Sequence, residues 1–203
     1  MEFVHVIKNI LPSNFCKSII DKFEVDSDKY QGRLGMGHIN LNIKKTLDLP
    51  ISDRKDWDCI TDPLLTCLAY GLQEYYRYME NQVFKGKYLQ IVEKMFGDNI
   101  NCTGFQIQKY EKDDHFYWHT DDAPDSKRLL AFIIYLNTVP DENGGTTDFL
   151  NGKSIQPEEG SILIFPSTWS YIHRGRALKS GKKYIITGFI RQTNLKLCKE
   201  DSL

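Results

Sequence analysis

Residues 128–137 read Arg128-Leu129-Leu130-Ala131-Phe132-Ile133-Ile134-Tyr135-Leu136-Asn137, and every side chain from Leu129 to Leu136 is apolar. A continuous apolar run of this length, bounded by polar residues, is typical of a strand buried on both faces. The backbone groups of such a strand need hydrogen-bonding partners from neighbouring segments. We therefore predict a buried strand over 128–137 with partner strands on either side of it in the sequence.

Several strand-like segments flank this run, and turn residues separate them. They are residues 102–110, 116–119, 146–150, 153–155, 161–165, 172–176 and 183–190. Asn151-Gly152 lies between two of these segments and is a hairpin signal. Seven or eight short strands separated by turns, with no helix between them, predict a β-sandwich or jelly roll.

The N-terminal half is predicted to be mainly helical. A short β-prone run at 3–7 precedes a first helix, for which Ser13 or Asn14 would be the cap. A second helix is predicted from about Trp57 to Met79, because apolar residues recur there at spacings of three and four. Asp62-Pro63 offers an alternative start for that helix.

A long polar segment, residues 25–54, separates the two helices and is dotted with glycines. We predict a loop with one short strand around residues 38–41. A loop of this length in a compact domain often serves a site, so we expect a lid or a substrate wall. Residues 88–96 predict one or two further helical turns.

No linker-like composition separates the helical half from the strand-rich half. We therefore expect a single domain, 1–203, of the α+β class and mainly β, with the helices packed on the outside of one sheet. In this division residues 1–98 supply helical support and the long loop. Residues 99–191 form the double-stranded β-helix, or jelly roll, and residues 192–203 a polar tail.

Composition narrows the classes of function. The 203 residues carry a net charge of −1, which argues against a broad electrostatic grip on nucleic acid. No apolar run reaches the roughly 18 residues of a membrane span, and the N-terminus lacks the pattern of a signal peptide. The five scattered cysteines are typical of free thiols in a reducing compartment. We expect a cytoplasmic protein that does not bind membranes; its oligomeric state is left open.

His119-Thr120-Asp121 is the candidate metal site within the strand block. Alternate side chains of an extended segment point the same way, so His119 and Asp121 can hold one metal ion together. His173 opens a later strand and is the candidate third ligand. Two histidines and one carboxylate with open positions opposite them suit non-haem Fe(II) and O2 chemistry.

Lys183 stands at the start of an otherwise apolar strand, ten residues beyond His173. A lysine that enters a core requires a partner charge. An anionic dicarboxylate that chelates a metal through one end would supply this partner at its other end. A solvent-exposed lysine at the strand edge is the alternative.

The segment from Tyr110 to Arg191 resembles the iron- and 2-oxoglutarate-dependent oxygenases, specifically the prolyl 4-hydroxylase-like branch. The matching pieces are Tyr110; His119-Thr120-Asp121; Arg128 with Tyr135-Leu136-Asn137; Gly144-Gly145-Thr146 with Phe149; Pro157 and Gly160 before Phe165-Pro166; His173; and Gly181-Lys182-Lys183-Tyr184 with Thr187. Tyr184 and Phe189 depart from the family, which often has tryptophan after the anchor and again near the end of that strand.

The resemblance implies that His119, Asp121 and His173 hold Fe(II). It implies that Lys183 pairs with the distal carboxylate of 2-oxoglutarate. Tyr110 and Tyr135 would hydrogen-bond this co-substrate, and Thr187 would line its pocket. The implied enzyme is a dioxygenase that uses O2, with ascorbate as an optional addition, and hydroxylates a protein or peptide side chain. Proline is the first candidate, and 2-oxoglutarate is converted to succinate and CO2.

Two other classes of function stay open from the sequence. One is an oxygenase on the same barrel that acts on a nucleic acid or a small molecule. The anchor Lys183 and the near-neutral charge count against a nucleic-acid substrate, because nucleobase-repair relatives usually anchor the co-substrate with arginine. The other is a jelly-roll binding module in which the His/Asp set holds a structural or incidental metal.

Overall fold

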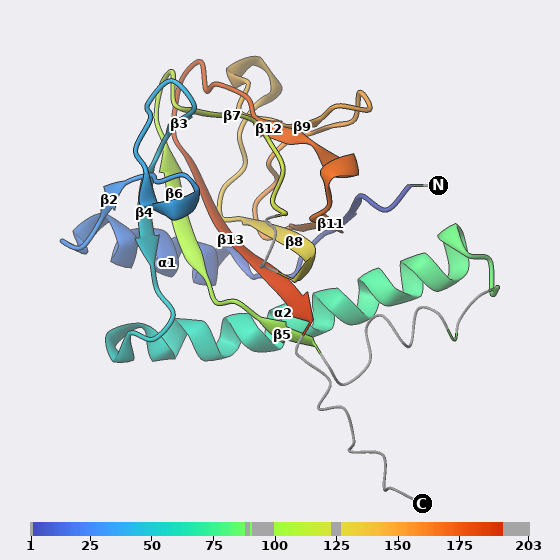
Figure 1. Cartoon of the computed structure of the whole chain (residues 1–203). Coiled ribbons are helices and arrows are strands. Elements are labelled where there is room, and N and C mark those ends of the chain that lie inside the picture. The colour runs from blue at the N-terminus through green and yellow to red at the C-terminus, as the bar shows by residue number, and fades with distance from the viewer. Residues whose placement is uncertain (1, 88–89, 91–99, 123–126, 193–203) are drawn as a thin grey trace, which may run out of the picture.

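The computed structural model describes residues 2–87, 90, 100–122 and 127–192. This part of the chain forms two antiparallel sheets, with two helices on the outside of the larger one (Figure 1). The sheets stay separate and do not close into one barrel. The predicted class, mainly β with N-terminal helices packed outside one sheet, is confirmed.

The larger sheet has eight strands, and its continuous path runs β1-β11-β8-β13-β6-β4-β2, with β5 pairing to β13. Their bounds are β1 His5–Ile7, β2 Tyr30–Gln31, β4 Leu47–Pro50, β5 Ile100–Cys102, β6 Gln106–Tyr110, β8 Arg128–Tyr135, β11 Ile162–Pro166 and β13 Lys183–Gln192. The apolar run forms β8, which lies between β11 and β13. Its residues from Leu130 to Tyr135 are buried, because helices cover one face of the sheet and the smaller sheet covers the other.

The smaller sheet has five strands in the order β10-β9-β12-β7-β3. Their bounds are β3 Lys44–Lys45, β7 His115–His119, β9 Thr147–Phe149, β10 Ser154–Ile155 and β12 His173–Gly175. The strands β9 and β10 form the hairpin that the Asn151-Gly152 turn predicts. This sheet carries the two candidate histidines, His119 and His173.

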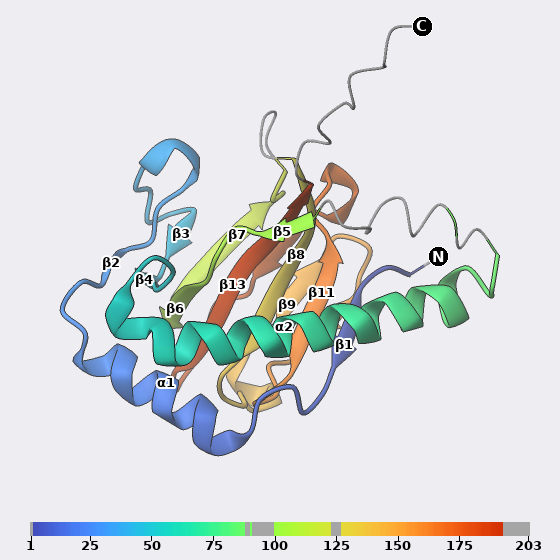
Figure 2. The same ribbon diagram turned by 90° about the horizontal axis from the view of Figure 1, so that it is seen from below.

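Two α-helices, α1 Ser13–Val25 and α2 Asp58–Tyr78, run across the same face of the larger sheet (Figure 2). Shorter helical turns occupy Gly35–Gly37 (η1), Lys55–Trp57 (η2), Met79–Val83 (η3), Asp141–Asn143 (η4) and Trp169–Tyr171 (η5). A large apolar core joins the buried side of both helices to the outer face of β6, β8, β11 and β13. A second core lies on the opposite face of these strands, toward the smaller sheet.

The predicted cap of the first helix and the alternative start of the second are wrong, whereas the predicted range from about Trp57 to Met79 matches α2. The cap of α1 is Pro12, with no side-chain hydrogen bond, so neither Ser13 nor Asn14 is the cap. The helix α2 begins before Asp62-Pro63 and contains Pro63 in its interior. Pro63 is the sixth residue of α2, beyond the four backbone donors that lack partners at a helix start, so it removes one hydrogen bond of the helix.

The prediction of a loop with a strand at 38–41 is also wrong in its details. The segment 25–54 contains three short strands, β2, β3 and β4, and none of them covers 38–41. The strand β4 pairs with β6 and extends the larger sheet, while β3 pairs with β7 and extends the smaller one. The N-terminal half therefore contributes sheet edges to both layers as well as helices.

The predicted strand 102–110 is interrupted at Gly104, which separates β5 from β6 and has a φ of 101°. A Cβ at this glycine would lie 2.6 Å from Ser52 Oγ, so the close approach requires glycine. Gln192, assigned to the tail, is the last residue of β13. The predicted turns at 88–96 and the remaining tail lie outside the described residues, apart from the isolated position 90.

The cysteines in the described part of the chain, Cys16, Cys59, Cys67 and Cys102, are free thiols, as predicted. Among the described helices, none combines the length and apolarity needed to cross a bilayer.

Candidate active site

Strands β7 and β12 bring the two candidate histidines together. They pair antiparallel, and His119 lies directly opposite His173 in the register. Asp121 follows the end of β7, with Oδ1 3.7 Å from His119 Nε2 and Oδ2 3.5 Å from His173 Nε2. One ligand atom from each residue lies within 4.8 Å of the other two. The three residues predicted from two separate segments therefore form one cluster.

Backbone carbonyls fix the orientation of both imidazoles. His119 Nδ1 lies 2.7 Å from the carbonyl oxygen of Tyr117, and His173 Nδ1 lies 3.0 Å from that of Tyr171. A carbonyl oxygen only accepts hydrogen bonds, so in each ring Nδ1 is the donor and carries the proton. The lone pair of each Nε2 then faces Asp121. This is the ring orientation in which histidine ligates a metal, with its other nitrogen held by a backbone carbonyl.

Aromatic side chains hold the histidine rings in place. The ring of Phe116 stacks on His119 at a centroid distance of 3.6 Å, and Phe165 packs edge-on against His173 at 4.7 Å. Burial, and then the neighbouring His173, lowers the pKa of His119 to about 3. Burial raises the pKa of Asp121 above its usual range. A desolvated carboxylate beside the neutral imidazole of His119 is a site that a divalent metal would stabilise.

The donor set fits Fe(II). Two imidazole nitrogens and one carboxylate on one side, with the other side facing a cavity, make the two-His, one-carboxylate face of non-haem iron sites. The cavity has a volume of about 420 Å³ and lies between the two sheets. Its lining includes all three cluster residues and Lys183.

Lys183 is 2% exposed and therefore enters the core, so the solvent-exposed alternative is excluded. Its Nζ donates to the carbonyl oxygen of Gly145 at 2.7 Å and lies over the rings of Tyr110 and Tyr135, at 4.9 and 5.9 Å from the centroids. Burial lowers the pKa of Lys183 to about 7, against the opposing field of Asp148. In the described part of the chain, no carboxylate lies within ion-pair distance of Nζ.

The other predicted co-substrate residues differ in position. Tyr110 and Thr187 line the cavity, and the Tyr110 hydroxyl donates to Gln108 Oε1 at 2.9 Å. Tyr135 is fully buried and is not among the lining residues. Its hydroxyl is hydrogen-bonded to Thr147 Oγ1 at 2.9 Å, and it is Thr147 that reaches the cavity.

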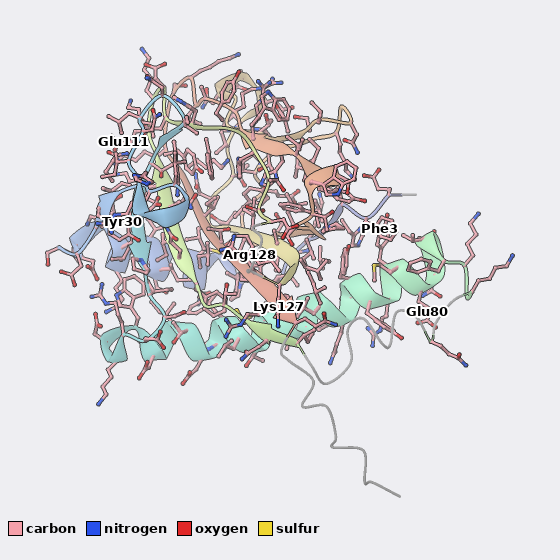
Figure 3. All side chains as sticks on the ribbon, viewed as in Figure 1. Phe3, Tyr30, Glu80, Glu111, Lys127 and Arg128 are labelled. Atoms are coloured by element: carbon pink, nitrogen blue, oxygen red, sulfur yellow. The ribbon has the colours of Figure 1, made fainter. Side chains whose placement is uncertain are left out.

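Arg128 stands at the start of β8, where Figure 3 labels it. Its guanidinium donates to the backbone carbonyl of Asp121 at 2.8 Å and lies 3.7 Å from the ring centroid of Phe189. The contact fixes the backbone that carries the carboxylate ligand. Arg128 itself also lines the cavity.

Sequence reasoning missed a buried ion pair that supports the cavity wall. Lys44 Nζ lies 2.6 Å from Asp48 Oδ2, and the two residues are 4% and 0% exposed. Thr46 Oγ1 and Gln106 Nε2 also donate to Asp48, at 2.7 and 2.6 Å. One signal in the sequence pointed to this pair. Thr46 and Asp48 alternate with Leu47 and Leu49, which is the period of a strand with one polar and one apolar face.

A second missed cluster lies on the other side of β9. Asp148 accepts hydrogen bonds from Thr146, Ser154, Arg174 and Arg176, at 2.6–3.0 Å. Burial opposes its charge, but these hydrogen bonds outweigh burial and lower the pKa of Asp148 to about 2. Asp148 thereby ties β9 to β10 and to β12, which carries His173.

Residues 105–191 match the model of the 2OG-Fe(II) oxygenase superfamily, a range that contains the cluster and Lys183. No curated protein matches the chain in sequence. A viral collagen prolyl hydroxylase from Paramecium Bursaria Chlorella virus-1, solved with 2OG, is similar with a TM-score of 0.65 and 18% identity, over 95% of this chain and 97% of that one.

Two further solved structures share the fold. A prolyl hydroxylase from Trichoplax adhaerens, in complex with a fragment of hypoxia inducible factor, has a TM-score of 0.69 and 16% identity, over 93% of this chain and 83% of that one. A Pseudomonas putida prolyl-4-hydroxylase has a TM-score of 0.66 and 14% identity, over 95% and 94%. Residues 105–191 therefore form a 2OG-Fe(II) oxygenase domain, and the chain has the fold of prolyl hydroxylases. Together with the His-Asp-His cluster, this domain makes the protein a 2-oxoglutarate-dependent dioxygenase that uses Fe(II) and O2.

Proposed function

We propose that this dioxygenase hydroxylates a prolyl residue of a protein or peptide and converts 2-oxoglutarate to succinate and CO2. The observation that carries the proposal is one cavity with His119, Asp121 and His173 on its wall and the buried ammonium of Lys183 in the same lining. A dicarboxylate that chelates the metal through one end would pair with the Lys183 ammonium through its other end. The fold shared with three prolyl hydroxylases supports proline as the target.

In this proposal Nε2 of both histidines and the Asp121 carboxylate hold Fe(II). When bound, the iron supplies the activation of O2 that drives oxidative decarboxylation and oxidation of a substrate C–H bond. The protein's own residues orient the metal ligands and shield them from water. The carbonyls of Tyr117 and Tyr171 keep both Nε2 lone pairs turned toward the metal position. The aromatic rings of Phe116 and Phe165 hold the imidazoles and exclude water.

Lys183 would bind the distal carboxylate of 2-oxoglutarate. A buried ammonium without a carboxylate partner is costly, and the incoming anion removes that cost. The Tyr110 hydroxyl and Thr187 line the same cavity and would complete the co-substrate pocket. For Tyr135 we propose an indirect role, because its hydroxyl reaches the cavity only through Thr147.

The segment 25–54 would form part of the substrate wall. Arg33, Leu34, Gly35 and Ile43 line the cavity, which supports the lid assignment made from the sequence. We also propose that residues 1–203 act as one domain, because β1 pairs with β11 and β4 with β6 across the two halves. We further propose that the protein works in the reducing environment of the cytoplasm, a proposal that the free thiols support.

The test is turnover. Purified protein is incubated with Fe(II), ascorbate, 2-oxoglutarate and a library of proline-containing peptides, and mass spectrometry seeks peptides that gain one oxygen. We expect succinate to rise in proportion to that product, and His119→Ala to abolish both. Turnover of single-stranded oligonucleotides instead of peptides would reassign the substrate. A protein in which Mn(II) and 2-oxoglutarate together give no thermal stabilisation would be a binding module.

A further inference from the structure

A β-bulge interrupts the pairing of β7 with β12, two neighbouring strands of the smaller sheet (Figure 1). Two residues of β7, Tyr117 and Trp118, stand opposite one residue of β12, Arg174. The flanking pairs of the ladder are His119 with His173 and Phe116 with Gly175. A bulge of this kind inserts one residue, bends the strand and is common next to active sites, where it re-aims a side chain.

The bulge decides to which face of the sheet His119 points. Side chains of a regular strand alternate, so residues three apart, such as Phe116 and His119, would point to opposite faces. With the extra residue between them, both side chains reach the cavity, and their rings stack at a centroid distance of 3.6 Å. A strand without the bulge that kept Phe116 in the cavity would turn His119 away from Asp121 and His173.

The backbone of the bulge also fixes the ring of His119. Nδ1 of this ring donates to the carbonyl oxygen of Tyr117 at 2.7 Å. The extra residue of a bulge takes no part in the ladder to the partner strand, so a carbonyl at this position is available to a side chain. The carbonyl belongs to the peptide bond between Tyr117 and Trp118, and that bond is planar. The placement of Trp118 therefore sets the direction of the hydrogen bond to His119.

A contact on the outer face of the smaller sheet holds Trp118. Arg174 follows His173, which faces the cavity, so its side chain points to the outer face. Its guanidinium lies 4.6 Å from the centroid of the Trp118 ring, a cation–π contact. Its Nε donates to Oδ2 of Asp148, the residue directly opposite on β9, at 3.0 Å. Trp118 and Arg174 are both half-buried, and neither is among the described residues that line the cavity.

We propose that Trp118 and Arg174 are positioning residues for the metal centre. The stacked pair on the outer face locks the bulge, and the bulge aims Nε2 of His119 at the metal position. Asp148 supports the pair by holding the guanidinium. Neither residue touches the metal, the co-substrate or the substrate. The inference goes beyond the choice of substrate, because it concerns the metal site that any substrate of this enzyme would use.

Metal binding tests the proposal without turnover. Isothermal titration calorimetry gives the Kd for Mn(II), and the visible absorption bands of bound Co(II) report the arrangement of its ligands. Trp118→Leu removes the ring, Trp118→Phe keeps an aromatic ring, and Arg174→Leu removes the guanidinium. The matched control is Arg176→Leu. Arg176 also donates from Nε to Asp148 Oδ2, at 2.9 Å, but none of the described aromatic rings lies under its guanidinium.

We expect the Kd for Mn(II) to rise about tenfold in Trp118→Leu and Arg174→Leu, the lower end of the effect of losing an outer-shell partner of a metal ligand. The Co(II) bands should shift in both variants. Trp118→Phe should keep the Kd within about threefold of the wild type, because a guanidinium also stacks on phenylalanine. Arg176→Leu should keep the wild-type Kd and Co(II) bands, although it removes the same kind of bond to Asp148.

Two results would overturn the positioning role. One is a wild-type Kd together with wild-type Co(II) bands in Arg174→Leu. The other is an equal loss in Arg174→Leu and Arg176→Leu, which would assign the effect to Asp148 and the stability of the smaller sheet. Circular dichroism checks that each variant is folded, and the two arginine variants still decide the question if Trp118→Leu does not fold. A wild-type protein that binds neither metal would refute the metal centre itself, and the positioning role with it.

Discussion

His119 and His173 face each other across β7 and β12, with their ring centroids 4.2 Å apart. The register of one strand pair thus places both Nε2 atoms beside the Asp121 carboxylate. A shift of either strand by one residue would turn one imidazole to the opposite face of the sheet. The metal cluster depends on this pairing as much as on the identity of its three residues.

Removal of any one member should abolish tight metal binding. Asp121→Ala leaves two imidazoles without the anionic donor, and His173→Ala leaves one imidazole and one carboxylate. We expect Mn(II) affinity, measured by isothermal titration calorimetry, to fall at least about 100-fold, because loss of a ligand should exceed the 10–100-fold cost of losing an outer-shell partner. His115→Ala on the same strand, outside the cluster, is the control. Unchanged affinity in the cluster variants would remove the metal assignment.

Lys183→Met should abolish the stabilisation by 2-oxoglutarate while leaving the protein folded. A ligand that binds the native state raises the melting temperature by mass action, so Mn(II)-loaded wild-type protein should melt at a higher temperature with 2-oxoglutarate present. Met has a similar volume and no charge to bury, so the unliganded variant should be at least as stable as the wild type. Differential scanning fluorimetry measures both effects. A variant that still responds to 2-oxoglutarate would exclude Lys183 as the anchor.

The free energy of unfolding should change with pH because Lys183 is buried. Burial lowers the folded-state pKa of Lys183 to about 7 from its ordinary value of 10.5. Between these values the unfolded chain binds more protons, so the unliganded protein should gain stability as pH rises from about 7 to 10. The affinity for 2-oxoglutarate should fall over this range, because the anion binds the protonated form. Urea unfolding at several pH values should show that Lys183→Met loses this gain; an identical gain in the variant would contradict it.

Asp148 should stabilise the smaller sheet. Asp148→Ala leaves two arginines and two hydroxyls without their shared acceptor, and we expect a loss of about 2–4 kcal/mol in the free energy of unfolding. Its pKa is lowered to about 2, below its ordinary 3.8. The contribution is therefore present above about pH 4 and lost as pH falls toward 2. Denaturant unfolding at pH 7 and at acid pH tests both parts, with exposed Asp141→Ala as the control. A loss under 0.5 kcal/mol would contradict the assignment.

The buried pair of Lys44 and Asp48 should be strongly coupled. Lys44→Met leaves a fully buried carboxylate without its cation, which should cost about 3–5 kcal/mol. Adding Asp48→Asn removes the stranded charge and should recover much of that loss. A double-mutant cycle by urea unfolding measures the coupling. Additive effects would show that the two side chains act independently.

The strand-rich half could be predicted because its signals are local. The continuous apolar run that forms β8, the Asn151-Gly152 turn between β9 and β10, and the alternation in 102–110 that contains β6 each specify their own backbone. The strands of the N-terminal segment 25–54 were not predicted. The strands β2 and β3, with two residues each, are too short to show a period, and only β4 carries a brief alternation, around Leu47 and Leu49. They are strands only because the edges of β6 and β7 supply hydrogen-bonding partners.

By itself the sequence determined the residue types that the chemistry requires: two histidines and an aspartate for the metal, and a lysine inside an apolar strand. The tertiary structure alone decided which of the other residues reach the cavity. It turned the Tyr135 hydroxyl toward Thr147, directed the Gln106 amide onto Asp48 and buried Lys44 beside it. These orientations depend on contacts between segments far apart in the chain. A local pattern of residues does not specify which distant residue a side chain will contact.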